Sequence, residues 1–131
     1  MVVLDETDLY LLFNKYEDVF LLNKKTQQEL WLTCMSGEPA CGKISLRDDW
    51  IVIGGESLQL WSDNKLKTIE DSDLTWIHDL RQTGDHEIEV LIDPWSEKPA
   101  IWRLNLKSSK KTKVRDFKDY QDREYTDSVR W

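Results

Sequence analysis

The stretch HEIEVLIDPWSEKPAIWRLNL, residues 86–106, carries the clearest secondary-structure pattern in the chain. Isoleucine and valine alternate with glutamate over residues 86–93, and Trp102, Leu104 and Leu106 alternate with polar residues over 100–106. A period of two is typical of β-strands, whose successive side chains point to opposite faces of a sheet. The stretch therefore predicts a β-hairpin with one face in a core and a longer loop at residues 94–99.

Short apolar segments of the same kind recur along the rest of the chain. They cover residues 9–13, 19–22, 29–35, 49–53, 57–61 and 65–70, and they are separated by turn-forming residues such as Gly54-Gly55 and Asp63-Asn64. Residues 72–83 fit a strand best, although Ser72 and Gly84 would also suit the two ends of a short helix. We expect a mainly β protein: an antiparallel meander of about eight or nine strands forming a barrel, a sandwich or a curved sheet, with at most one short helix.

Residues 50–63, WIVIGGESLQLWSD, resemble the inner strands of a β-propeller blade of the WD type. At 40 to 45 residues a blade, a chain of 131 residues holds about three blades, whereas a closed propeller has four or more. We therefore attribute this likeness to the common chemistry of hairpins.

The length suits one domain, and the charge is distributed unevenly along it. Residues 107–131 hold eight Lys and Arg against five Asp and Glu, a net charge of +3. Residues 1–106 hold ten against twenty, a net charge of -10, so the whole chain carries -7. We expect residues 1–106 to form an antiparallel β domain. Residues 107–131 would pack on it or extend it as an edge strand, as a short helix on Phe117 and Tyr120, or as a tail.

The same composition excludes several classes of protein. A nucleic-acid surface needs a basic footprint, which an acidic chain lacks, so we expect no nucleic-acid partner. The N-terminal residues MVVLDETDLY do not match a secretory signal, and no apolar run approaches the roughly twenty residues of a membrane span. We therefore expect a cytoplasmic protein without a membrane partner. In that compartment Cys34 and Cys41 would be free thiols, although a local disulfide between them is sterically conceivable.

Residues suited to catalysis or to metal binding are few. His78 and His86 are the two histidines, and together with Cys34 and Cys41 they have the residue types of a zinc site but not its usual spacing. Glu87 and Glu89 fall on one face of a predicted strand, which is more typical of a solvated face than of a glycosidase pair. We expect no catalytic residue, no metal and no cofactor.

Acidic residues and tryptophans gather between residues 70 and 95. Carboxylates speed the encounter with a basic protein, and buried aromatic rings then hold the complex together. The alternative is an ordinary acidic face that keeps the protein in solution. The predicted partner-binding residues are Asp71, Asp73, Trp76, Asp79, Glu87, Glu89 and Trp95.

In its size, its acidity and its seven tryptophans the chain resembles the small immunity proteins of bacterial toxin systems, such as contact-dependent inhibition. This resemblance implies a protein that neutralises a basic toxin domain, such as a nuclease, by covering its active site. We weigh two alternatives. One is a β-barrel that holds a small apolar ligand near Trp50, Trp61 or Trp102, and the other is an enzyme that uses His78 or His86.

Overall fold

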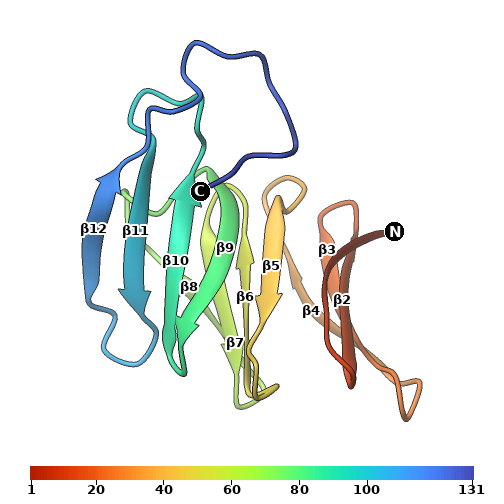
Figure 1. Ribbon diagram of the computed structural model, residues 1–131. Coiled ribbons are helices and arrows are strands. Elements are labelled where there is room, and N and C mark those ends of the chain that lie inside the picture. The colour runs from red at the N-terminus through yellow and green to blue at the C-terminus, as the bar shows by residue number, and fades with distance from the viewer.

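The computed structural model describes residues 1–131, and its secondary structure consists of strands alone (Figure 1). There is therefore no helix that is long and apolar enough to cross a membrane. The twelve strands are β1 (Val2–Glu6), β2 (Tyr10–Lys15), β3 (Asp18–Asn23), β4 (Glu29–Cys34), β5 (Cys41–Ile44), β6 (Trp50–Gly54), β7 (Leu58–Ser62), β8 (Lys65–Ile69), β9 (Ile77–Gly84), β10 (Glu87–Ile92), β11 (Ala100–Asn105) and β12 (Lys111–Asp116).

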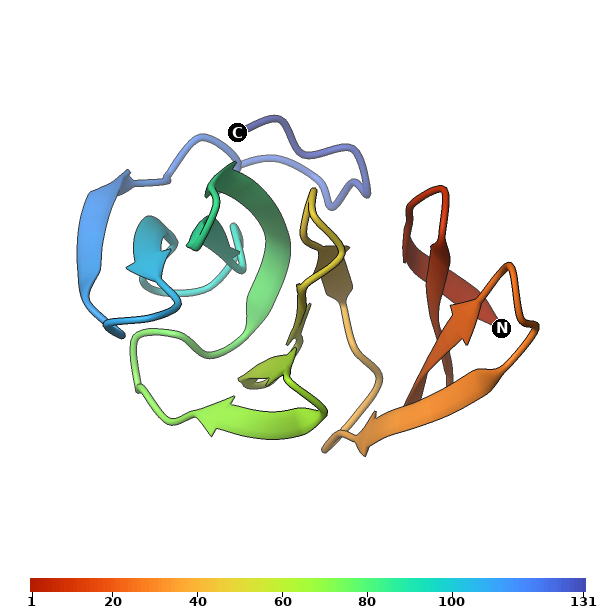
Figure 2. The same cartoon turned by 90° about the horizontal axis from the view of Figure 1, so that it is seen from below.

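The strands form three separate sheets, and each sheet is an antiparallel meander of four consecutive strands. Sheet 1 is β1–β4, sheet 2 is β5–β8 and sheet 3 is β9–β12. The first strands contact one another, β1 against β5 and β5 against β9, and the sheets fan out from these strands (Figure 2). Four-stranded meanders placed side by side through their first strands are the arrangement of propeller blades. The three sheets form an open array of this kind.

This architecture corrects the sequence prediction in two respects. The chain has twelve strands instead of eight or nine, and three sheets instead of one meander, so the barrel that the ligand-binding alternative requires does not form. The additional strands are β1, β5 and β12. Each lacks a clear alternating pattern: β5 reads CGKI and β12 reads KTKVRD. Residues 50–63, whose sequence resembles part of a propeller blade, lie in and around β6 and β7, the two middle strands of sheet 2. The likeness therefore reflects the blade-like arrangement of this sheet as well as the common chemistry of hairpins.

Sheet 2 is covered on both faces, and this position explains the uninterrupted apolar sequence of β6. All five residues of β6 are buried, because alternate side chains point toward sheet 1 and sheet 3. The core between sheets 2 and 3 includes Trp50, Val52, Leu60, Leu80, Ile88, Val90 and Leu104. The core between sheets 1 and 2 includes Leu12, Val19, Leu21, Ile44, Ile51 and Ile53.

The turns of sheet 2 use two different devices. Asp63 and Asn64 both have positive φ, 51° and 59°, which makes the two-residue hairpin between β7 and β8 that the sequence predicts. Gly54 does not have positive φ. A Cβ atom there would lie 2.7 Å from Ile77 Cγ2 and 2.9 Å from the Cys41 sulfur, so this glycine is needed for the close approach of β5 and β9.

The C-terminal segment, residues 117–131, covers part of the outer face of sheet 3. Phe117 and Tyr120 are buried against Leu91 and Ile101, and Trp131 packs at the edge of this cluster. Of the alternatives for residues 107–131, the structure has an edge strand followed by an irregular packed segment. Both cysteines are free thiols.

Candidate functional site

A cleft of about 400 Å³ lies where β5 and β9 begin; we call it the Trp76 cleft. Its walls come from the β4–β5 loop, the turn between β6 and β7, the residues just before β9 and the C-terminal segment. These segments meet at one end of the molecule, the upper end in Figure 1. Its titratable and aromatic side chains are Glu38, Glu56, Trp76, His78, Asp93 and Tyr125.

The backbone of Trp76 is held from both sides. Its N–H donates to the Glu56 carbonyl at 3.2 Å, and its own carbonyl accepts from Asp93 N–H at 2.8 Å. The next N–H, of Ile77, donates to the Gly55 carbonyl at 2.7 Å. These bonds hold Trp76 in the left-handed region, with φ 53°, which is rare for a bulky residue. Such conformations persist only where the surroundings impose them, and they concentrate at functional sites.

The Trp76 side chain stands between two hollows. It is 61% exposed, although large apolar residues are usually covered. One hollow is the Trp76 cleft, and the other, of about 410 Å³, extends from Trp76 toward Trp102 in sheet 3. A projecting indole with a hollow on each side can enter a partner surface while the partner's side chains fill the hollows.

The Trp76 cleft is acidic, and its carboxylates are partly free. Glu38 and Glu56 are exposed and make no ion pair, while an oxygen of Asp93 accepts from Trp95 N–H at 3.0 Å. Neither Lys nor Arg lines the cleft. Tyr125 is 69% exposed, and its hydroxyl donates to Asp127 at 2.8 Å. This hydrogen bond and the nearby negative charge raise the pKa of Tyr125, so its side chain stays neutral.

Other predicted acids are neutralised within the chain. Lys111 Nζ lies 2.5 Å from an oxygen of Asp71 and 2.6 Å from an oxygen of Asp73. The hydrogen bond from Lys111 lowers the pKa of Asp71. The same ammonium lies 4.8 Å from the centre of the Trp102 ring. Asp71 and Asp73 therefore join the start of β12 to the loop between β8 and β9.

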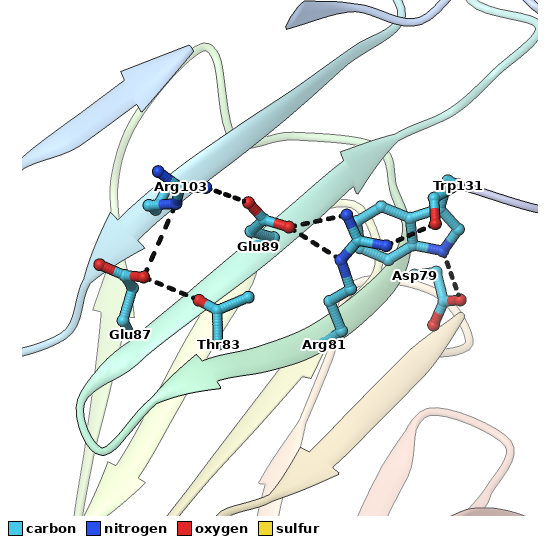
Figure 3. Close-up of polar contacts among 7 residues, drawn as sticks. All are labelled: Asp79, Arg81, Thr83, Glu87, Glu89, Arg103 and Trp131. Atoms are coloured by element: carbon cyan, nitrogen blue, oxygen red, sulfur yellow. Dashed lines mark hydrogen bonds and ion pairs between the residues drawn. The ribbon is translucent and has the colours of Figure 1, made fainter. Parts of the chain in front are cut away.

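Figure 3 shows that the predicted acids of sheet 3 belong to an ion network on its outer face. Glu89 is 4% exposed, whereas the sequence pattern predicts a solvated position. Its carboxylate accepts from Arg81 Nε at 2.8 Å and from an Arg103 terminal nitrogen at 2.8 Å. Burial by itself raises the pKa of Glu89, but the two guanidinium groups outweigh burial and hold this pKa below its usual range.

The C-terminal segment completes this network. An Arg81 terminal nitrogen donates to the Trp131 carbonyl, and the Arg81 guanidinium stacks 4.1 Å from the centre of the Trp131 ring. The Trp131 indole N–H donates to Asp79 at 3.0 Å. Glu87 accepts from the Thr83 hydroxyl at 2.9 Å and lies 3.6 Å from Arg103. Asp79, Glu87 and Glu89 thus hold the sheet and the segment together.

Trp95 has a structural position, unlike Trp76. Its ring contacts His78, Tyr120 and Tyr125, with ring centres 6.0, 5.8 and 5.0 Å apart. Its indole N–H donates to the Arg123 carbonyl at 3.0 Å. Of the seven predicted residues, only Trp76 lines the Trp76 cleft.

The residues weighed for catalysis or metal binding lie apart. His78 is the second residue of β9 and His86 lies in the turn after it, so most of one strand separates them. Cys41 is buried, and burial strongly raises the pKa of its thiol. No group of three or more His, Cys, Asp or Glu side chains is placed to hold a metal ion.

Sequence reasoning missed Glu38, Glu56 and Tyr125. They come from three loops with no shared pattern, and only the packing of sheets 2 and 3 brings them together. The left-handed conformation of Trp76 also leaves no mark in the sequence. Comparison with known proteins adds no further assignment, because no protein-family model and no curated protein matches this chain.

Proposed function

We propose that this protein binds a basic protein partner at the Trp76 cleft and inhibits it. The observation that carries the proposal is a mostly exposed tryptophan, held in a strained backbone conformation beside carboxylates without ion-pair partners. Tryptophan, tyrosine and arginine are enriched among the residues that dominate binding energy at interfaces.

The rigidity of Trp76 supports this proposal. Ordering a flexible side chain at an interface costs about 0.5–1.5 kcal/mol, and a backbone that is already held reduces that cost. The left-handed conformation costs the free protein of order 1–3 kcal/mol. Folding alone does not need a tryptophan in this position, because glycine adopts the same φ without strain.

Charge supports a cationic partner. Glu38 and Glu56 make no ion pair, in contrast to Asp71, Asp73, Glu87 and Glu89, which are neutralised internally. A lysine or arginine of the partner would meet carboxylates and the faces of Trp76 and Tyr125, which favour cations. The net charge of -7 would also accelerate the encounter.

The specific form that we propose is an immunity protein that covers the active site of a basic toxin domain, such as a nuclease. Exposed carboxylates around an aromatic anchor are suited to occupying a surface that otherwise binds phosphates. In this proposal the contacts are Trp76, Glu38, Glu56 and Asp93. The remaining predicted acids hold the fold together.

The experiment uses a basic secreted toxin domain encoded beside the gene of this chain. Its dissociation constant and its residual activity are measured with the wild-type chain and with Trp76→Ala. Loss of a tryptophan anchor costs about 2 kcal/mol or more, so we expect the dissociation constant to rise roughly thirtyfold and toxin activity to return. The double variant Glu38→Lys/Glu56→Lys slows association most at low salt.

The control is Glu29→Lys on the distant strand β4, which makes the charge change of one of these two substitutions. It leaves both measurements within about twofold of the wild type, since exposed charges more than a Debye length away are largely screened. The proposal fails if the toxin domain does not bind, or if Trp76→Ala and the double variant bind as tightly as the control.

A further inference from the structure

Residues 121–131 cross the cleft end of the molecule as an irregular strap, and we call them the strap. They follow Phe117 and Tyr120, which are buried against sheet 3. The strap extends past β9 toward β5 and then returns to β9, as Figure 1 and Figure 2 both show. No residue of the strap is buried, and none forms a backbone hydrogen bond with a strand. The strap is therefore held mainly by side-chain contacts.

Trp131 fastens the strap to β9. The Arg81 guanidinium lies 4.1 Å from the centre of the Trp131 ring and donates to the Trp131 carbonyl. The Trp131 indole N–H donates to Asp79 at 3.0 Å (Figure 3). Arg81 is itself fixed, because its Nε donates to the buried carboxylate of Glu89 at 2.8 Å. Both partners of Trp131 thus belong to a rigid strand.

The middle of the strap carries Tyr125, which lines the Trp76 cleft. The Tyr125 ring packs on the half-buried Trp95, with ring centres 5.0 Å apart. The Trp95 indole N–H also donates to the carbonyl of Arg123, at 3.0 Å. This wall of the cleft therefore rests on sheet 3 through one ring contact and one hydrogen bond at Trp95.

A strap with so few contacts in its middle depends on both of its ends. The end at Tyr120 is buried, and its hydroxyl accepts from Arg130 N–H at 3.0 Å. Without Trp131, only the contacts with Trp95 and Tyr120 oppose the conformational freedom that an irregular segment gains on release. Exposed segments with few packing contacts are the parts of a protein that open most easily. The position of Tyr125 thus depends on Trp131, although Trp131 does not line the cleft.

We propose that Trp131 is a positioning residue for partner binding: by fastening the strap to β9, it holds Tyr125 in place as a wall of the Trp76 cleft. This inference rests on the proposed function. A cationic side chain of the partner would enter between the faces of Trp76 and Tyr125. A wall that is held in place beforehand does not have to be ordered on binding, and this favours the complex.

The first measurement needs no partner. Trypsin is added to the folded chain, and the rate of cleavage after Arg123 is followed by mass spectrometry. The Arg123 carbonyl is bonded to Trp95, so cleavage there requires the strap to open. We expect Trp131→Ala to raise this rate at least roughly fivefold while the circular dichroism spectrum stays native. The control Trp31→Ala removes a tryptophan from the distant sheet 1 and leaves the rate within about twofold of the wild type.

The second measurement uses the basic toxin domain of the proposed function. Tyr125→Ala and Trp131→Ala each raise its dissociation constant at least roughly fivefold. Because both substitutions act through the same wall, Trp131→Ala adds less than about twofold in the Tyr125→Ala background, whereas a general loss of structure would multiply the two effects. Trp131→Phe keeps an aromatic ring for Arg81 but lacks the indole N–H, so it restores part of the affinity.

The possible failures point to different conclusions. The inference is overturned if Trp131→Ala is cleaved after Arg123 no faster than the control. It is also overturned if Trp131→Ala binds the toxin domain as tightly as the wild type while Trp76→Ala does not, and the proposed function then stands. Multiplied effects in the double variant overturn the action of Trp131 through Tyr125. A toxin domain that does not bind the wild-type chain overturns the proposed function and this inference together.

Discussion

The buried carboxylate of Glu89 gives the most direct test of how sheet 3 is held together. We consider the substitution Glu89→Gln, which keeps the size and one acceptor of the side chain but removes its charge. Glu89 accepts from Arg81 and Arg103 at 2.8 Å each, and Arg81 also holds the C-terminal segment. The substitution therefore weakens both the sheet and the attachment of residues 117–131.

The magnitude follows from the exposure of the three side chains. A hydrogen bond to a charged group contributes about 1.5–3 kcal/mol. The side chain of Glu89 is 6% exposed, but those of Arg81 and Arg103 are 41% and 48% exposed, so water partly replaces the lost contacts. We expect the free energy of unfolding at pH 7 to fall by about 2 kcal/mol, out of a typical total of about 5–15 kcal/mol.

The effect depends on pH in a defined direction. The arginines hold the pKa of Glu89 in the folded protein below its usual range, so the charged form stabilises the fold. This contribution is complete above the pKa of an unfolded glutamate, about 4.3, and is lost as the pH falls through the lower folded pKa. The difference between the wild type and Glu89→Gln therefore shrinks below about pH 4.

The assay is urea unfolding followed by tryptophan fluorescence at pH 7 and at acid pH. The matched control is Glu87→Gln on the same strand, whose half-exposed side chain lies 3.6 Å from Arg103 and changes stability by less than about 1 kcal/mol. The reasoning is refuted if Glu89→Gln is no more destabilising than this control at pH 7, or if its effect is equally large at acid pH.

Three further predictions follow from local geometry. Trp76→Gly removes the strain of the left-handed backbone conformation, so we expect the midpoint of urea unfolding to stay unchanged or rise while partner binding is abolished. A clear drop in the midpoint contradicts the strain argument. We expect a thiol reagent to label exposed Cys34 in the native protein and buried Cys41 only after denaturation, which mass spectrometry of the digested protein measures. Equal labelling of both cysteines in the native protein contradicts the packing of β5. Gly54→Ala forces a Cβ against Ile77 and lowers the free energy of unfolding by about 1–3 kcal/mol, so an unchanged value in urea unfolding refutes this close approach.

The sequence predicted the middle strands of each sheet better than the edges. Strands β6, β7, β10 and β11 follow their apolar patterns closely, because they are paired on both sides and pack on the core. Strands β1, β5 and β12 were missed or left open, because few of their side chains alternate and neighbouring strands supply their hydrogen bonds. A sequence pattern predicts a strand well where buried and exposed side chains alternate. It predicts a strand poorly where the strand forms mainly through hydrogen bonds to its neighbours.

The candidate site shows the same division. The sequence places Trp76 among acidic residues, and in the structure Trp76 is exposed and lines a cleft. The acids near it in sequence do not line the Trp76 cleft, although Asp73 lines the second hollow beside Trp76. Asp71 and Asp73 are neutralised by Lys111, forty and thirty-eight residues away, while Glu38 and Glu56 arrive from other loops.

The sequence by itself determined a β protein with short strands, an acidic surface and enough aromatic rings for a core. These properties depend on composition and on the period of two, which any strand requires whatever its neighbours. Only the tertiary structure decided that the strands divide into three sheets and which carboxylates stay free of ion pairs. Those outcomes depend on contacts between residues far apart in the chain, such as Arg81 with Trp131, and no local pattern encodes such contacts.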